Sequence, residues 1–228
     1  MKVILFGASG MVGQGVLREC LLDPAVERVL TVVRRATGQR HAKVVEQVHD
    51  NFVDFSAIER QLSGYDACFF CLGVSSAGMS EDAYRRVTHD ITLAAANTLV
   101  RRNAAAMTFI FVSGAGTDSS EQGRTMWARV KGQTENALLR LRFNAAYMFR
   151  PGFIQPQHGI TSRTRAYRVL YALFAPLFPV LQALFPAHVM TTEQLGRAML
   201  RAAKLGAPRP VLEASDIIAL AAAAPAQG

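Results

Sequence analysis

Short apolar runs alternate with longer, helix-like segments along the first 150 residues of the chain. The first run, Val3–Phe6, is followed directly by glycine. Uniformly apolar runs of about four to eight residues are typical of parallel strands that are buried on both faces. The pattern predicts strands at Lys2–Phe6, Arg28–Val33, Lys43–Val48, Asp66–Leu72, Met107–Val112 and Ala145–Phe149.

The segments between these strands predict helices from their starting residues. Ser56 and Glu59 have the spacing of a capping box, and Ser80 precedes a long helical stretch. The longer helices are expected at Glu81–Arg102 and Gln122–Leu141. Strands that alternate with helices in this way predict an α/β fold, a Rossmann-type doubly wound parallel sheet with helices on both faces.

The pattern changes after Pro151, where a loop-like stretch leads into the apolar, proline-interrupted segment Ala166–Met190. Thr191–Gln194 has the residues to cap one more helix, which we expect to end near Lys204. The remaining predictions are a strand at Pro208–Leu212, a turn capped by Ser215 and a frayed tail at Ala221–Gly228. We therefore expect residues 151–228 to form a small helical lid and substrate region within the same domain.

The charge of the chain is basic but dispersed. Lysine and arginine number 25 against 17 acidic residues, a formal net charge of +8. The excess lies in scattered pairs such as Arg85-Arg86 and Arg101-Arg102, without a basic stripe interleaved with aromatic residues. This distribution argues against nucleic-acid binding.

Cysteine use indicates a reducing compartment, because the chain has only three cysteines. Cys68 and Cys71 have C-x-x-C spacing, but residues three apart on a strand point to opposite faces, so we expect neither a redox pair nor a metal site. A strand that begins at Lys2 leaves no room for a signal peptide. These observations predict a cytoplasmic location, with peripheral contact at the inner membrane face as an additional possibility.

The turn after the first strand has the pattern Gly-x-x-Gly-x-x-Gly, formed by Gly7, Gly10 and Gly13. In a strand–turn–helix context the first glycine permits the turn, the second lets backbone approach a pyrophosphate and the third lets the helix pack on the strand. A helix start also presents free N–H groups and a positive dipole end to an anion. We expect a dinucleotide here, with contacts from Ser9, Met11 and Val12; the alternative is a tight turn without a ligand.

The residues after the second strand indicate which dinucleotide binds. In this fold a carboxylate there favours NAD, whereas arginine favours the 2′-phosphate of NADP. Arg34 and Arg35 follow the second strand and no acid lies nearby, so we predict NADP(H) bound by residues 1–150. Two solvated surface arginines are the alternative.

Further cofactor contacts are expected at the ends of three other strands. Asp50 is placed to reach the adenine amino group and Asn51 to offer its backbone, although an Asp-Asn turn explains the pair equally well. The stretch Cys71-Leu72-Gly73 ends the fourth strand beside the expected cofactor ribose, and Pro151 and Gly152 follow the sixth strand.

Together these features resemble the short-chain dehydrogenase/reductase superfamily, in particular the Tat-interacting-protein-like group of its atypical branch. The similarity extends over most of residues 2–215. It implies a Rossmann-type domain, NADP(H) and oxidoreductase ancestry. The matching stretches are Leu5–Gly13, Val32–Arg35, Phe69–Gly73, Tyr84–Val87, Phe111–Ser120, Val130–Leu138 and Phe149–Gly152.

The resemblance also implies a catalytic Ser, Tyr and Lys, with Tyr four residues before Lys on one helix face. Ser113 and Lys131 match two of these positions, but Trp127 occupies the tyrosine position. An indole donates a hydrogen bond but has no accessible pKa for moving a proton. The protein would then bind NADP(H) without turnover, use another proton source such as His158 or a Ser113-bound water, or need little acid catalysis.

The expected function is therefore oxidation or reduction of a small or lipophilic carbonyl, in which Ser113 orients the carbonyl and Lys131 the nicotinamide ribose. The alternative is a catalytically impaired NADP(H) sensor or scaffold. The apolar stretch Tyr167–Val189 is expected to form a lid, or else to make peripheral membrane contact through residues 163–190 with arginines at the headgroups. The sequence leaves open whether the protein is a monomer or a homodimer.

Overall fold

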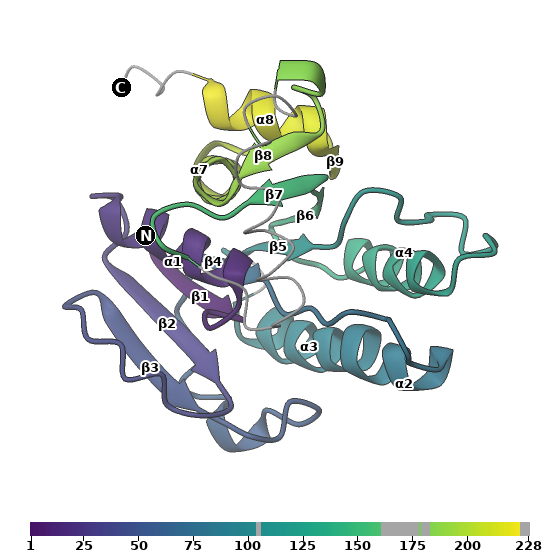
Figure 1. Ribbon diagram of the computed structural model, residues 1–228. Helices are drawn as coiled ribbons and strands as arrows, with labels where there is room; N and C mark the ends of the chain where they lie inside the picture. The colour runs from purple at the N-terminus through teal and green to yellow at the C-terminus, as the bar shows by residue number, and fades with distance from the viewer. Residues whose placement is uncertain (104–105, 161–177, 179–182, 224–228) are drawn as a thin grey trace.

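The computed structural model describes residues 1–103, 106–160, 178 and 183–223, and its main feature is a parallel sheet (Figure 1). Seven strands of the described chain form this sheet, in the order β3-β2-β1-β4-β5-β6-β9. Every neighbouring pair is parallel. The strands are β1 (Lys2–Phe6), β2 (Arg28–Val33), β3 (Val44–Val48), β4 (Ala67–Phe70), β5 (Thr108–Val112), β6 (Ala145–Arg150) and β9 (Val211–Glu213). The Rossmann-type α/β fold is thus confirmed.

Helices cover both faces of the sheet, as Figure 1 shows. Helices α1 (Met11–Leu22), α7 (Thr192–Leu205) and α8 (Ala214–Ala222) share one hydrophobic core with one face. Helices α3 (Ile91–Asn103) and α4 (Met126–Leu139) pack on the other face, with the short α2 (Glu81–Arg85) before them. The side chains of β1 alternate between these cores, because successive residues of a strand point to opposite faces.

The order of the strands creates a crevice beside β1. From β1 the chain moves outward through β2 to β3, and then returns to β4 on the other side of β1. In open parallel sheets, ligands bind at the carboxyl ends of the strands where the order reverses in this way. The glycine turn lies at this point, directly after β1.

The two cysteines of the C-x-x-C spacing pack on opposite sides of the sheet. Cys68 belongs to the core beneath α3, whereas Cys71 packs against the core beneath α1. The period-two geometry of the strand therefore separates the two thiols, as predicted.

Two predicted helix starts are wrong. The Ser56 capping box does not form, because the Ser56 N–H donates to Asp54 Oδ1 at 2.9 Å, and only a 3-10 turn, Ser56–Ile58, follows. The helix predicted from Gln122 begins at Met126, because the Asp118 carboxylate accepts from the N–H groups of Ser120 and Gly123 and holds that stretch in a turn.

The other caps are partly as predicted. Ser80 caps α2 by accepting from the Ala83 N–H, but a π-helical stretch, Arg86–Asp90, interrupts the helix before α3. Thr191 and Gln194 form the expected capping box on α7. The final helix, α8, is capped by Glu213 rather than by Ser215.

A small second sheet occupies part of the region predicted as loop. Strand β7 (Phe153–Gln155) pairs in parallel with β8 (Val189–Thr191). Most of the apolar segment between them lies outside the described residues, and with it the predicted lid and membrane contact. Within the described ranges, no helix combines the length and the apolar character that a membrane crossing needs.

The turn after β1 gives a matched pair of substitutions. A Cβ at position 13 would lie 2.0 Å from the Gly7 carbonyl oxygen, whereas one at position 10 would meet that atom at 3.4 Å. We expect Gly13→Ala to lower the free energy of unfolding by about 2–3 kcal/mol, since backbone must move to admit the methyl group. Gly10→Ala should cost much less, and equal urea midpoints for the two variants would contradict this packing.

Candidate functional site

The glycine turn is held by backbone contacts that exclude side chains. Gly7 adopts φ +82°, and a Cβ there would lie 2.7 Å from the Cys71 carbonyl carbon. The Gly10 N–H donates to the Gly7 oxygen at 2.9 Å, closing the turn. The backbone that follows β1 thus touches the backbone that follows β4, and α1 begins shortly afterwards, at Met11.

The start of α1 is left open for an anion. Gly10 is its N-terminal cap residue, and no side chain among the described residues caps it. Met11, Val12 and Gly13 form the first turn, so the turn carries no acidic side chain. Uncapped N–H groups and the positive end of the helix dipole favour a phosphate at this position.

A cavity of about 620 Å³, here called the arginine cavity, lies on one side of the turn. Arg34 and Arg35 line it together with Asp50. Among the described residues, neither guanidinium has a hydrogen-bond or ion-pair partner, so both are available to a ligand. Its other lining residues are Gly7, Ser9, Val32, Val33, Ala36, Phe52 and Leu72.

Asp50 and Asn51 each fit a different one of the two predicted roles, which were cofactor contact and turn formation. The Asn51 Oδ1 accepts from the Val53 N–H at 3.3 Å, which is a turn contact, and Asn51 is not among the residues lining the arginine cavity. Asp50 lines that cavity. The turn is therefore made by the asparagine, and the aspartate remains available to a ligand.

A second cavity, of about 440 Å³, lies on the other side of the turn and is called the lysine cavity here. It brings together most of the remaining predicted residues, which come from the turn, the ends of β4, β5 and β6, and α4. Leu72 lines both cavities, so they adjoin along the carboxyl edge of the sheet. The predicted residues that line the lysine cavity are Gly10, Met11, Val12, Cys71, Leu72, Gly73, Ser113, Lys131, Pro151 and Gly152.

Lys131 lines the lysine cavity, and its ammonium group is held in place there. Its Nζ donates to the Ser113 carbonyl oxygen at 2.5 Å. The Trp127 ring, one helical turn earlier, lies with its centroid 5.7 Å from this Nζ, so the indole meets the ammonium as a cation–π partner. Burial lowers the pKa of Lys131 to about 8, and the nearby Glu135 carboxylate partly offsets this effect.

A buried ion pair beneath the cavity was not anticipated from the sequence. Ser113 Oγ donates to Glu135 Oε1 at 2.5 Å, and Arg150 donates to both oxygens of the same carboxylate. Glu135 is 1% exposed and Arg150 9% exposed. The one sign of this pair in the sequence was the position of Glu135, one helical turn after Lys131. The contact with Arg150 joins distant segments and could not be inferred from spacing.

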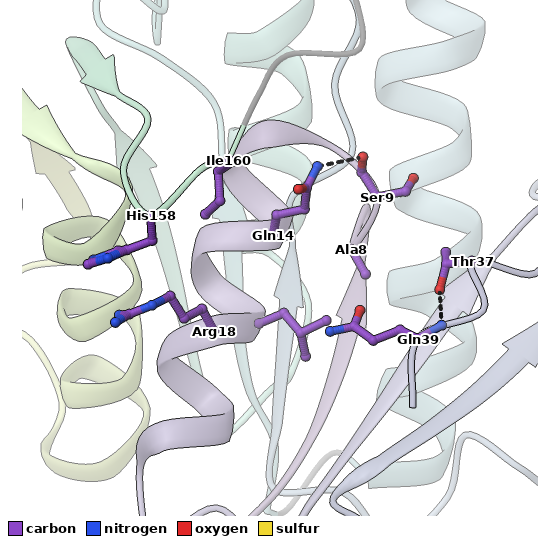
Figure 2. Close-up of a pocket in the computed structure, with 9 residues that line it drawn as sticks. Ala8, Ser9, Gln14, Arg18, Thr37, Gln39, His158 and Ile160 are labelled. Carbon is purple, nitrogen blue, oxygen red and sulfur yellow. Dashed lines mark hydrogen bonds between the residues drawn. The ribbon is translucent and has the colours of Figure 1, made fainter. Parts of the chain in front are cut away.

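His158 does not lie in the lysine cavity. It lines a third cavity with Gln14 and Arg18 beside the start of α1, as Figure 2 shows. Its Nε2 lies 2.8 Å from Glu193 Oε2 on α7. The structure therefore gives no support to His158 as a proton source at Lys131.

The fold is that of the short-chain dehydrogenases/reductases. The structure matches an oxidoreductase of the short-chain dehydrogenase/reductase family from Burkholderia thailandensis with a TM-score of 0.66 at 17% identity, covering 96% of this chain and 92% of that one. It matches UDP-glucose 4-epimerase from Thermotoga maritima with a TM-score of 0.65 at 13% identity, covering 97% of this chain and 81% of that one. No family model matches the sequence.

The curated relatives show which group within that class the chain resembles. Rat protein HTATIP2 is 29% identical over 157 residues, which are 67% of this chain and 62% of that protein. The mitochondrial protein fmp52 of Emericella nidulans is 27% identical over 208 residues, 88% of this chain and 86% of that protein. The homologues of this chain thus include HTATIP2, and the chain is similar to the Tat-interacting-protein-like group of the atypical short-chain dehydrogenases/reductases.

The same relatives correct the prediction of a cytoplasmic location. The fungal FMP52 proteins are named mitochondrial, including those of Scheffersomyces stipitis and Aspergillus fumigatus. The prediction relied on sparse cysteine and an early first strand, and neither feature distinguishes between reducing compartments. The cytoplasmic assignment is therefore wrong on this comparison.

The buried ion pair can be tested with a matched pair of variants. Glu135→Gln leaves the Arg150 charge without its buried partner, so we expect a loss of about 3–5 kcal/mol in the free energy of unfolding. Glu213, which also pairs with Arg150, is 49% exposed, and Glu213→Gln should cost less than about 1 kcal/mol. Urea denaturation measures both, and similar losses would show that burial does not set the strength of these contacts.

Proposed function

We propose that this protein is an NADP(H)-dependent oxidoreductase that acts on a small or lipophilic carbonyl compound. The observation that carries the proposal is the continuity of the two cavities. Two arginines that have no partner in the described part of the chain line one, a lysine lines the other, and Leu72 and the glycine turn lie between them. This is the arrangement that a dinucleotide with a phosphate at one end needs.

The residues fit the dinucleotide chemically as well as sterically. The uncapped start of α1 would hold the pyrophosphate, and the close approach of Gly7 to Cys71 keeps side chains out of its path. Arg34 and Arg35 would bind the 2′-phosphate, and Asp50 would accept from the adenine amino group. Lys131 would hold the nicotinamide ribose. When bound, the nicotinamide supplies or accepts a hydride.

The character of the lysine cavity supports an apolar substrate. Beside its polar groups it is lined by aliphatic side chains, among them Val74, Val112 and Ile154. Such walls favour a lipophilic carbonyl over a sugar nucleotide, whose hydroxyl groups would lose their hydrogen bonds with water there. We propose that residues 1–150 bind the cofactor and that residues 151–228 complete the substrate region.

A second candidate function is an NADP(H) sensor without turnover. Trp127 at the position of the family's tyrosine favours it, as does the Ser113 hydroxyl, which donates to Glu135. The two functions differ in one measurement: a sensor binds NADPH but does not consume it with any member of an aldehyde and ketone panel.

The cofactor assignment predicts a selective loss of affinity. Arg34→Ala and Arg35→Ala should each weaken NADPH binding by about 10- to 100-fold, the equivalent of one lost charged hydrogen bond. NADH, which lacks the 2′-phosphate, should bind almost as it does to the wild type. Isothermal titration calorimetry with both cofactors measures the difference.

Arg209→Ala is the matched control, since Arg209 is an exposed arginine paired with Asp216, near β9 at the far edge of the sheet from β2. It should leave both affinities unchanged. Equal losses for NADPH and NADH in the Arg34 and Arg35 variants would overturn the choice of NADP(H). Failure of the wild type to bind either cofactor would overturn both functions.

A further inference from the structure

The lysine cavity holds few groups that can exchange a proton. Of the described residues that line it, Cys71 and Lys131 are the two with titratable side chains. Burial raises the pKa of the Cys71 thiol far above neutrality, so this thiol stays protonated and is a poor acid. Lys131 is therefore the group with an accessible proton equilibrium.

Ser113 cannot donate to a substrate while its present hydrogen bond lasts. A hydroxyl carries one proton, and Ser113 Oγ has two acceptors within reach, Glu135 Oε1 at 2.5 Å and the Phe149 carbonyl oxygen at 3.1 Å. Arg150 donates to both oxygens of Glu135, so this carboxylate faces Ser113 as a hydrogen-bond acceptor. The serine proton is therefore directed to one of these two acceptors, of which Glu135 is the nearer, and it is not offered to the cavity.

Lys131 retains donors where Ser113 does not. An ammonium group has three N–H bonds, and one of them donates to the Ser113 carbonyl oxygen. The Nζ lies 3.5 Å from the position of a Cβ on Gly114, a residue that also lines the cavity. Because residue 114 is a glycine, it places no side chain of its own between the ammonium and the cavity.

We propose that Lys131 Nζ is the proton donor to the carbonyl oxygen, in the place that a tyrosine hydroxyl would otherwise take. The proposal rests on the oxidoreductase function proposed above. In reduction the carbonyl carbon gains a hydride, its oxygen gains a proton from the Lys131 ammonium, and the neutral amine recovers a proton from water. In oxidation the neutral amine takes the proton of the alcohol.

The surroundings of Lys131 set the pH at which it would work. Glu135 on the same helix favours the ammonium, Arg150 on β6 neutralises much of the Glu135 charge, and Cys71 beyond β4 is uncharged. Desolvation is the dominant effect and brings the pKa of Lys131 to about 8. The acid form is lost as the pH rises through that value, so carbonyl reduction should decline above pH 8 and alcohol oxidation should increase.

The single tryptophan of the chain reports directly on this group. Since Trp127 contacts the Lys131 ammonium, loss of the charge should change its fluorescence without any cofactor present. We expect one transition near pH 8 in a titration from about pH 6 to about pH 9, a range that ends about one unit below the tyrosine pKa. Lys131→Met should abolish the transition, whereas Cys71→Ala and the distant Lys204→Met should retain it.

Activity profiles complete the test. Lys131→Arg keeps a positive charge, but its guanidinium does not release a proton in this pH range. The variant should therefore retain NADPH binding while NADPH consumption falls by about 100-fold or more. In the wild type, the alkaline limb of NADPH consumption should coincide with the fluorescence transition. No transition in the wild type, or the same transition in Lys131→Met, would overturn Lys131 as the donor even if turnover is found. A normal transition without turnover on any carbonyl would instead refute the oxidoreductase function, and the donor role with it.

Discussion

The close approach of two backbone segments at the glycine turn is the constraint on which the rest of the site depends. Gly7 brings the exit of β1 against the exit of β4, and Gly13 lets α1 pack directly onto the turn. A side chain at either position would push apart the three elements that meet there. The arginine cavity and the lysine cavity adjoin only because this contact is so short, with Leu72 between them.

The polar groups around the lysine cavity include a buried ion pair and a lysine that lines the cavity. The Glu135–Arg150 pair lies beneath the surface and fixes the Ser113 hydroxyl, while Lys131 remains above it among aliphatic walls. A carboxylate neutralised by a guanidinium offers little stabilisation to a nearby ammonium, so burial has the larger effect on Lys131. In this way an ion pair that does not itself line the cavity fixes the Ser113 hydroxyl and limits its own effect on Lys131.

Features carried by local spacing could be predicted from the sequence. The strands, the glycine turn, Arg34-Arg35 and the helix position of Lys131 each depend on residues close together in the chain. The Ser56 capping box failed because Asp54 competes for the same N–H group. Glu135 and Arg150 were missed because their contact joins α4 to β6, and the pairing of β7 with β8 because each strand has three residues with a long segment between them. The proton arrangement at Ser113 followed only from these long-range contacts.

The packing of α7 on α1 has a consequence for how the protein is made. Gly196 of α7 lies against Glu19, and Gly15 of α1 against Thr192, so the helix that begins at the glycine turn is covered by the last quarter of the chain. During synthesis, α1 therefore leaves the ribosome long before its covering helix exists. At about 5–20 residues per second the delay is on the order of 10–40 s. Throughout that interval Val16, Leu17 and Cys20 lack their native cover, which makes the nascent amino-terminal half a natural client for a chaperone.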